Sequence, residues 1–129
     1  MTTAARVLVA EDDRFLRRAA EARLRQQGFN VLTAADGEEA LKVAQAELPD
    51  IILLDLIMPK LQGFEVLRTL KGSAATARIP VIVMSNLSQD SDRAQCMEGG
   101  AAAYLVKANL SLQDLVKAVQ ATLAAEVTR

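Results

Sequence analysis

The sequence alternates five times between a short run of apolar residues and a longer segment in which apolar residues follow helical spacing. The apolar runs are RVLVA (6–10), NVLTA (30–34), DIILLD (50–55), IPVIVMS (from 79 to about 84) and AAAYLV (101–106). Continuous apolar runs of this length are typical of strands that are buried on both faces. The alternation therefore predicts an α/β fold of the (βα)5 type, with a parallel sheet and helices on both of its faces.

Five helices are predicted between and after these runs. They are expected in RFLRRAAEARLRQQG, DGEEALKVAQAELP, FEVLRTLKG, the segment over about 88–98, and SLQDLVKAVQATLAAEV. Asp13 is expected to cap the first helix, and Asp36 to form a capping box with Glu39 at the second. Ser111 and Asp114 form the same pattern at the last helix. The apolar faces of the first and last helices are expected to be Phe15, Leu16, Ala19, Ala20 and Leu24, and Leu112, Leu115, Val116, Val119 and Leu123.

The length of 129 residues fits one domain, expected to span residues 1–129. The net charge of -1 argues against a general binder of nucleic acid or of anionic membranes, which would be basic. One cysteine and the lack of a signal peptide or membrane-spanning run predict a cytoplasmic protein. The chain contains no histidine, so any mechanism that needs one must obtain it from another protein.

Polar side chains gather where the predicted strands end. They are Glu11, Asp12 and Asp13 after the first strand, Asp55 at the third, Ser85 and Asn86 at the fourth, and Lys107 after the fifth. Because ligands of open parallel sheets bind at the carboxyl ends of the strands, these residues are expected to meet in one site. Taken singly, each has a structural explanation of equal weight, such as helix capping by Asp13 or a solvated strand end at Asp55.

Carboxylates held together repel one another, by roughly 4 kcal/mol per pair at a separation of about 4 Å and a protein-like dielectric constant. A divalent cation removes this conflict, and oxygen ligands without histidine or cysteine favour Mg²⁺ or Mn²⁺. The ammonium group of Lys107 and the hydroxyl group of Ser85, added to acids and a metal, suit a phosphoryl group. One carboxylate would then be the nucleophile that forms an acyl phosphate.

The chain resembles the response-regulator receiver domains of the CheY-like superfamily. The resemblance rests on VLVAEDD, IILLDLIMPKLQGFEVL, IPVIVMS and AAAYLVK, and on the spacing of Asp55, Ser85, Tyr104 and Lys107. These segments cover essentially the whole chain. The resemblance implies a doubly wound, flavodoxin/CheY-like fold with strand order 2-1-3-4-5.

The resemblance also implies a role for each residue of the site. Asp55 would be the phosphoacceptor. The metal ligands would be Glu11, Asp12, Asp55 and the backbone carbonyl of Ile57, with Asp12 the more direct ligand of the acidic pair. Ser85 and Lys107 would bind the phosphoryl oxygens, and Ser85 and Tyr104 would form a conformational switch.

The implied function is two-component signal transduction. A histidine kinase or a histidine phosphotransfer protein would donate the phosphoryl group in a reaction that depends on Mg²⁺. By this resemblance, the chain would catalyse its own phosphorylation and dephosphorylation and would not be an enzyme for other substrates. The surface of the fourth helix, fifth strand and fifth helix would then switch and control a downstream protein. The resemblance also allows for a dimer that depends on phosphorylation, and it implies no nucleic-acid or membrane partner.

Three positions depart from the family pattern. Ala108 follows Lys107 where the family usually has a proline after a cis bond, and a non-proline cis bond costs about 3 kcal/mol. We therefore expect a trans bond and a differently shaped loop. Gln62 replaces a common acid, with little expected effect. Asn86 is bulkier than the usual small residue and is expected to narrow access to Asp55.

Ile57 lies two residues after Asp55, and Leu87 lies two residues after Ser85. By resemblance, both flank the path of the water that hydrolyses the acyl phosphate. Apolar side chains cannot orient that water, so these two residues and Asn86 are expected to slow self-dephosphorylation. Loop packing is the alternative explanation, because isolated exposed apolar residues are common.

Three other protein classes fit the sequence less well than a receiver domain does. A phosphatase of the haloacid dehalogenase type would carry a DxD nucleophile motif at its first strand, which EDDR lacks. A flavin-binding module would need a phosphate loop there, and the acids of EDDRFL would repel a phosphate. A degenerate receiver usually lacks an acid, the hydroxyl or the lysine, and all of them are present.

Overall fold

The structure is a computed structural model that describes residues 4–86 and 90–127, and in it five parallel strands form one sheet. The strands are β1 (Arg6–Ala10), β2 (Asn30–Ala34), β3 (Ile51–Asp55), β4 (Val81–Ser85) and β5 (Ala103–Val106). Their order across the sheet is β2-β1-β3-β4-β5. This confirms the predicted (βα)5 fold and its strand order 2-1-3-4-5.

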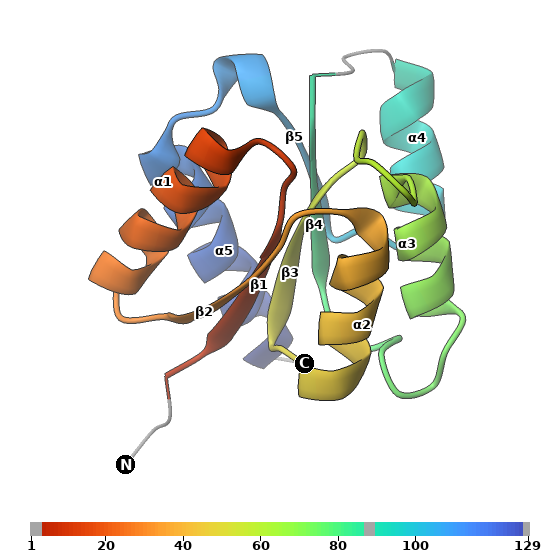
Figure 1. The fold of residues 1–129 in the computed structure, drawn as a ribbon, viewed down its shortest axis with the longest axis horizontal. Coiled ribbons are helices and arrows are strands. Elements are labelled where there is room, and N and C mark those ends of the chain that lie inside the picture. The colour runs from red at the N-terminus through yellow and green to blue at the C-terminus, as the bar shows by residue number, and fades with distance from the viewer. Residues whose placement is uncertain (1–3, 87–89, 128–129) are drawn as a thin grey trace.

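The helices cover both faces of the sheet. They are α1 (Arg14–Gln26), α2 (Gly37–Glu47), α3 (Gly63–Lys71), α4 (Asp90–Glu98) and α5 (Leu112–Val127), with a short 3₁₀ helix over Lys107–Asn109. Figure 1 shows α1 and α5 on one face, and α2, α3 and α4 on the other. The predicted start of α4 at 88 and 89 lies outside the described residues. Within the described ranges, no helix is long and apolar enough to cross a bilayer.

Two aliphatic clusters hold the helices against the sheet. Side chains of β1 alternate between them: Val7 and Val9 face α1 and α5, whereas Leu8 and Ala10 face α2 and α3. Because β1, β3 and β4 are covered on both sides, their sequences are almost continuously apolar. The polar residues that follow these strands therefore lie at one edge of the sheet.

The prediction that Phe15 belongs to the buried face of α1 is wrong. Its side chain is 89% exposed, while Ala20 and Leu24 are buried and Leu16 is half-buried. Leu16, Ala20 and Leu24 repeat every four residues and follow one stripe along the helix. Phe15 precedes that stripe by one position, about 100° around the helix axis, and it projects into solvent.

The predicted capping residues hold the helix starts. At α2, the Asp36 carboxylate accepts the N–H of Glu39 at 2.8 Å. The Glu39 carboxylate accepts the N–H of Ala35 at 2.7 Å, one residue earlier than in an ordinary capping box. The other two caps form as expected, by Asp13 with Leu16 and by Ser111 with Asp114.

Gly63 lets the loop after β3 fold back over the strand end. A Cβ atom at this position would lie 2.5 Å from the carbonyl oxygen of Asp55 and 2.6 Å from Cα of Leu56. The N–H of Gly63 also donates to the carbonyl of Leu56 at 2.8 Å. A side chain would push α3 away, so glycine at the start of α3 helps to set the loop beside Asp55.

Candidate functional site

An acidic cluster lies at the carboxyl edge of the sheet. Asp55 ends β3, and Glu11 and Asp12 follow the neighbouring strand β1, whose Ala10 pairs with Leu54. One carboxylate oxygen from each acid lies within 4.8 Å of the others. Glu11 and Asp55 are buried, at 1% and 4% exposed, and Asp12 is exposed. The predicted convergence of these three acids is therefore present in the structure.

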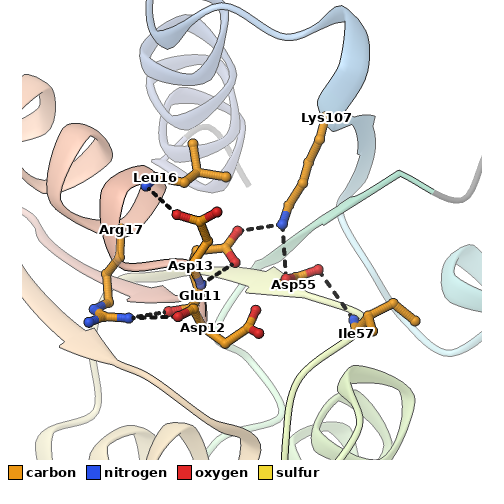
Figure 2. A network of polar contacts seen from close by, with 8 residues as sticks. All are labelled: Glu11, Asp12, Asp13, Leu16, Arg17, Asp55, Ile57 and Lys107. Carbon is orange, nitrogen blue, oxygen red and sulfur yellow. Dashed lines mark hydrogen bonds and ion pairs between the residues drawn. The ribbon is translucent and has the colours of Figure 1, made fainter.

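Lys107 joins the two buried acids. Its Nζ atom lies 2.9 Å from Oδ2 of Asp55 and 2.5 Å from Oε1 of Glu11 (Figure 2). Burial alone would lower the pKa of Lys107, but the nearby carboxylates of Glu11 and Asp55 outweigh burial and hold the pKa above its ordinary value. The Lys107 side chain is therefore a cation in contact with both buried carboxylates.

One cation does not balance the cluster. Burial raises the pKa of Glu11 to about 7, and the nearby Asp55 adds to the rise, while Lys107 and the N–H of Asp13 offset part of it. Oε1 of Glu11 is buried and accepts no hydrogen bond from the described residues, because its contact with Lys107 lacks hydrogen-bond geometry. The cluster thus retains one buried carboxylate oxygen that accepts no hydrogen bond from the described residues, and it retains negative charge that Lys107 does not neutralise.

These features fit a hard divalent cation. The donors are carboxylate oxygens from Glu11, Asp12 and Asp55, which Mg²⁺ and Mn²⁺ accept. The N–H of Ile57 donates to Oδ1 of Asp55 at 3.2 Å, so the loop after β3 helps to orient that carboxylate. Coordination by the Ile57 carbonyl stays a prediction.

Ser85 and Tyr104 lie beside the cluster on β4 and β5. Ser85 ends β4, next to β3 in the sheet, and is fully buried. Tyr104 is 5% exposed, and the guanidinium of Arg93 lies 5.3 Å from the centre of its ring. Burial raises the pKa of Tyr104, and a hydrogen bond with the Ser85 side chain offsets part of the rise. The side chains of Ser85 and Tyr104 are thus in contact and the tyrosine ring is buried, while their role as a switch stays a prediction.

The other predicted positions have separate outcomes. Asn86 is exposed at the end of β4, and Leu87 lies outside the described residues. Ile57 is 55% exposed beside Asp55. The bond between Lys107 and Ala108 is trans, as expected, and it lies within the short 3₁₀ helix Lys107–Asn109.

Arg17 is a residue of this region that the sequence analysis missed. Its side chain donates to the backbone carbonyls of Glu11, at 2.8 Å, and Asp12, at 3.3 Å. The available signal was a basic residue four positions after the Asp13 cap, on a helix that directly follows the acidic segment. Several arginines of α1 share the basic character, so sequence alone did not single it out.

The five-stranded parallel sheet and its edge of acids, hydroxyl and lysine define a phosphoacceptor signalling domain. The family model of the response regulator receiver domain matches residues 7–120. The chain therefore belongs to the response regulator receiver domain family of two-component signalling.

Known proteins with the same architecture support this assignment. The chain is 42% identical to the gliding motility regulatory protein of Myxococcus xanthus over 114 residues, 88% of this chain and 15% of that protein. It is 44% identical to the transcriptional regulatory protein PrrA of Mycobacterium bovis over 121 residues, 94% of this chain and 51% of that protein. The receiver domain of the Francisella response regulator 1452 superposes with a TM-score of 0.87 at 28% identity, covering 94% of this chain and 98% of that one.

The chain spans about half or less of the length of these two relatives. The match therefore concerns the receiver, and the activities of the complete relatives are not transferred to this chain.

The raised pKa of Glu11 predicts that Mg²⁺ binding weakens in acid. A carboxylate must lose its proton to bind the metal, so the apparent affinity should fall about tenfold from pH 8 to pH 6. Isothermal titration calorimetry at constant ionic strength measures the Mg²⁺ affinity at each pH. The pKa of Lys107 is raised by its carboxylate neighbours, and the pKa values of Asp36 and Asp114 are lowered by backbone hydrogen bonds, so these groups keep their charge over this range.

The same shift has a consequence without metal. Because the folded-state pKa of Glu11 exceeds its ordinary value of 4.5, a bound proton favours the folded state. The free energy of unfolding in EDTA should therefore fall as pH rises from 4.5 towards 7. Glu11→Gln should remove that dependence of the unfolding free energy on pH. For the metal-bound state, equal Mg²⁺ affinity of the parent at pH 6 and pH 8 would contradict the predicted weakening in acid.

Proposed function

We propose that the Asp55 carboxylate receives a phosphoryl group from a phosphohistidine of a kinase or phosphotransfer protein, in a reaction that requires Mg²⁺ or Mn²⁺. The observation that carries this proposal is the position of Asp55, buried at a strand end between the acidic pair and the ammonium group of Lys107. A family that receives phosphoryl groups implies a cognate histidine kinase. The absence of histidine from this chain agrees with an external donor.

The residues divide the chemistry between them. An oxygen of Asp55 forms a bond to phosphorus as the P–N bond of the donor breaks, and the departing imidazole keeps the electron pair and takes a proton. Lys107 and the hydroxyl of Ser85 would bind phosphoryl oxygens, while Glu11, Asp12, Asp55 and the Ile57 carbonyl would hold the metal. When bound there, Mg²⁺ or Mn²⁺ would supply positive charge that offsets the negative charge of the phosphoryl group.

The test is incubation of the chain with acetyl phosphate, with and without Mg²⁺, followed by intact-mass spectrometry. One added phosphoryl group that needs Mg²⁺ and is removed by hydroxylamine supports an acyl phosphate on the receiver. A purified histidine kinase, autophosphorylated with labelled ATP, then tests transfer from phosphohistidine. No labelling by either donor would refute the proposal.

We also propose that phosphorylation acts through Ser85 and Tyr104 on the surface formed by α4, β5 and α5. The Tyr104 ring lies inside and is held from two sides, by the Ser85 hydroxyl and by Arg93 of α4. When Ser85 turns to a phosphoryl oxygen, the ring loses one of these contacts, and α4 can shift through Arg93. Beryllofluoride with Mg²⁺ should therefore change the NMR signals of the Tyr104 ring, and more weakly in Ser85→Ala. Identical tyrosine signals with and without beryllofluoride would indicate a fixed packing residue.

Self-dephosphorylation is expected to be slow, with a phosphoryl lifetime of minutes or longer. Ile57 is exposed beside Asp55 and offers no group that could orient a water molecule. Orienting a reactant can change a rate by orders of magnitude, so Ile57→Asn and Leu87→Glu should speed the decay measured after removal of the donor. Leu48→Asn, at another exposed apolar position outside the cluster, serves as the control. Decay of the parent within seconds, or no faster decay in either variant, would show that the shielding argument is wrong.

The domain extent, cellular location, downstream partner and oligomeric state of the receiver stay predictions. We propose that residues 1–129 act as one receiver, that it works in the cytoplasm, and that it controls a downstream protein. A dimer that forms on phosphorylation is also proposed, and size-exclusion chromatography with beryllofluoride tests it.

A further inference from the structure

Arg17 reaches from α1 back to the loop that carries the acidic pair. Its Nη1 atom donates to the carbonyl of Glu11 at 2.8 Å and to that of Asp12 at 3.3 Å (Figure 2). The side chain is half-buried, whereas Arg14 and Arg18 on the same helix are exposed. Arg17 therefore differs from its neighbours by a defined contact with the backbone of the acidic pair.

This contact comes where strand pairing stops. The N–H of Glu11 still donates to Ala34 of β2 at 3.0 Å. Beyond it, the backbone of Glu11 and Asp12 leaves the sheet, and the guanidinium of Arg17 binds the two carbonyls. Glu11 is buried, so its backbone carbonyl needs a hydrogen-bond donor, and Arg17 supplies one where the sheet does not.

The side chain of Glu11 is held from the same end of α1. Its Oε2 atom accepts the N–H of Asp13 at 3.1 Å, and Asp13 itself caps the helix. The backbone of Glu11 is tied to Arg17, and its carboxylate to the residue just before α1. Residues at the start of α1 thus hold the backbone of Glu11 and Asp12 and the carboxylate of Glu11.

We infer that Arg17 is a positioning residue for the divalent cation, because it orients the backbone from which the Glu11 and Asp12 carboxylates project. The inference rests on the proposed function, in which this acidic pair binds the metal. Groups that orient metal ligands without touching the metal commonly change metal affinity by about 10-fold to 100-fold when they are removed. A planar guanidinium, with several N–H donors in a fixed geometry, suits binding of two neighbouring carbonyls better than the compact, strongly hydrated ammonium group of a lysine.

The sign of the effect separates positioning from charge. As a positive charge near the acids, Arg17 repels Mg²⁺, and its removal would strengthen binding on electrostatic grounds alone. As a positioning residue it aligns the ligands, and its removal weakens binding. The two explanations therefore predict opposite changes in the dissociation constant.

The experiment titrates Mg²⁺ into the full chain without a phosphodonor, at constant ionic strength, and follows amide chemical shifts by NMR. Arg17→Met should raise the dissociation constant about tenfold, and Arg17→Lys should restore part of the affinity. Arg18→Met removes the same charge from an exposed neighbour and should leave the affinity unchanged or slightly higher. Urea unfolding in EDTA checks that each variant is folded at the temperature of the titration.

The outcomes are distinct. Equal or tighter Mg²⁺ binding in folded Arg17→Met, with normal binding in the parent, would overturn the inference alone. No Mg²⁺ binding by the parent would overturn the proposed function and this inference with it. If Arg17→Met does not fold, Arg17→Lys decides: weaker binding than the parent supports positioning, and unchanged binding overturns it.

Discussion

Asp55→Asn is expected to reduce the incorporation of phosphate from acetyl phosphate to background, while the parent chain gains one phosphoryl group. An asparagine amide lacks the negative charge and the nucleophilic oxygen that form the acyl phosphate. The substitution is otherwise conservative, because the remaining side-chain oxygen can still accept the N–H of Ile57, now at 3.2 Å from Oδ1. Intact-mass spectrometry after incubation with Mg²⁺ measures the loss.

Asp50→Asn is the matched control for this variant. Asp50 lies just before the opposite end of β3, where its Oδ2 atom accepts the N–H of Arg6 at 2.7 Å. An asparagine there makes the same chemical change away from the cluster, and labelling should stay at the parent level. Labelling of Asp55→Asn at the parent level, still removed by hydroxylamine, would place the phosphoacceptor elsewhere.

Lys107→Met is expected to slow phosphorylation by about 100-fold, the usual effect of removing one group that stabilises developing charge. The same variant should lose roughly 3 kcal/mol of unfolding free energy in EDTA near pH 8, because Glu11 and Asp55 remain buried without their cation. Mg²⁺ binding should become tighter, since the ion no longer competes with the ammonium group. Acetyl phosphate kinetics, urea unfolding and Mg²⁺ titration measure these three effects.

The combination of slower phosphorylation and tighter metal binding is specific to Lys107. A variant that merely distorts the cluster would slow phosphorylation and also lower the affinity for Mg²⁺. Lys42→Met, at an exposed lysine on α2, should change none of the three measurements. Unchanged phosphorylation in Lys107→Met would remove the lysine from the phosphoryl-binding site.

The strands and the edge of the site could be predicted from the sequence because both follow from local patterns. The run IILL before Asp55 is apolar without interruption, which is typical of a strand covered on both faces. A parallel sheet brings the carboxyl ends of its strands to one edge, so Asp55 and the acids after β1 had to lie near each other. The caps at Asp13 and Asp36 depend on contacts within one helical turn and were also predictable.

Burial on a helix was less predictable than its position in the chain. Phe15 fits an apolar helical pattern, yet it lies outside the stripe that α1 presents to the sheet. The pattern gives the period of a helix, and the docking of α1 decides which side of it is covered. A one-residue difference in phase is enough to expose a large side chain.

The sequence by itself determined the alternating elements, the order of polar residues along the chain and, through the strand ends, the edge at which they meet. The tertiary structure alone decided that Lys107 contacts both Glu11 and Asp55, that Arg17 binds the backbone of the acidic pair, and that Tyr104 lies inside beneath Arg93. Each of these contacts joins elements whose separation is set by the packing of helices on the sheet. Local spacing along the chain specifies which groups are available, but the reach and direction of a side chain across strands depend on that packing.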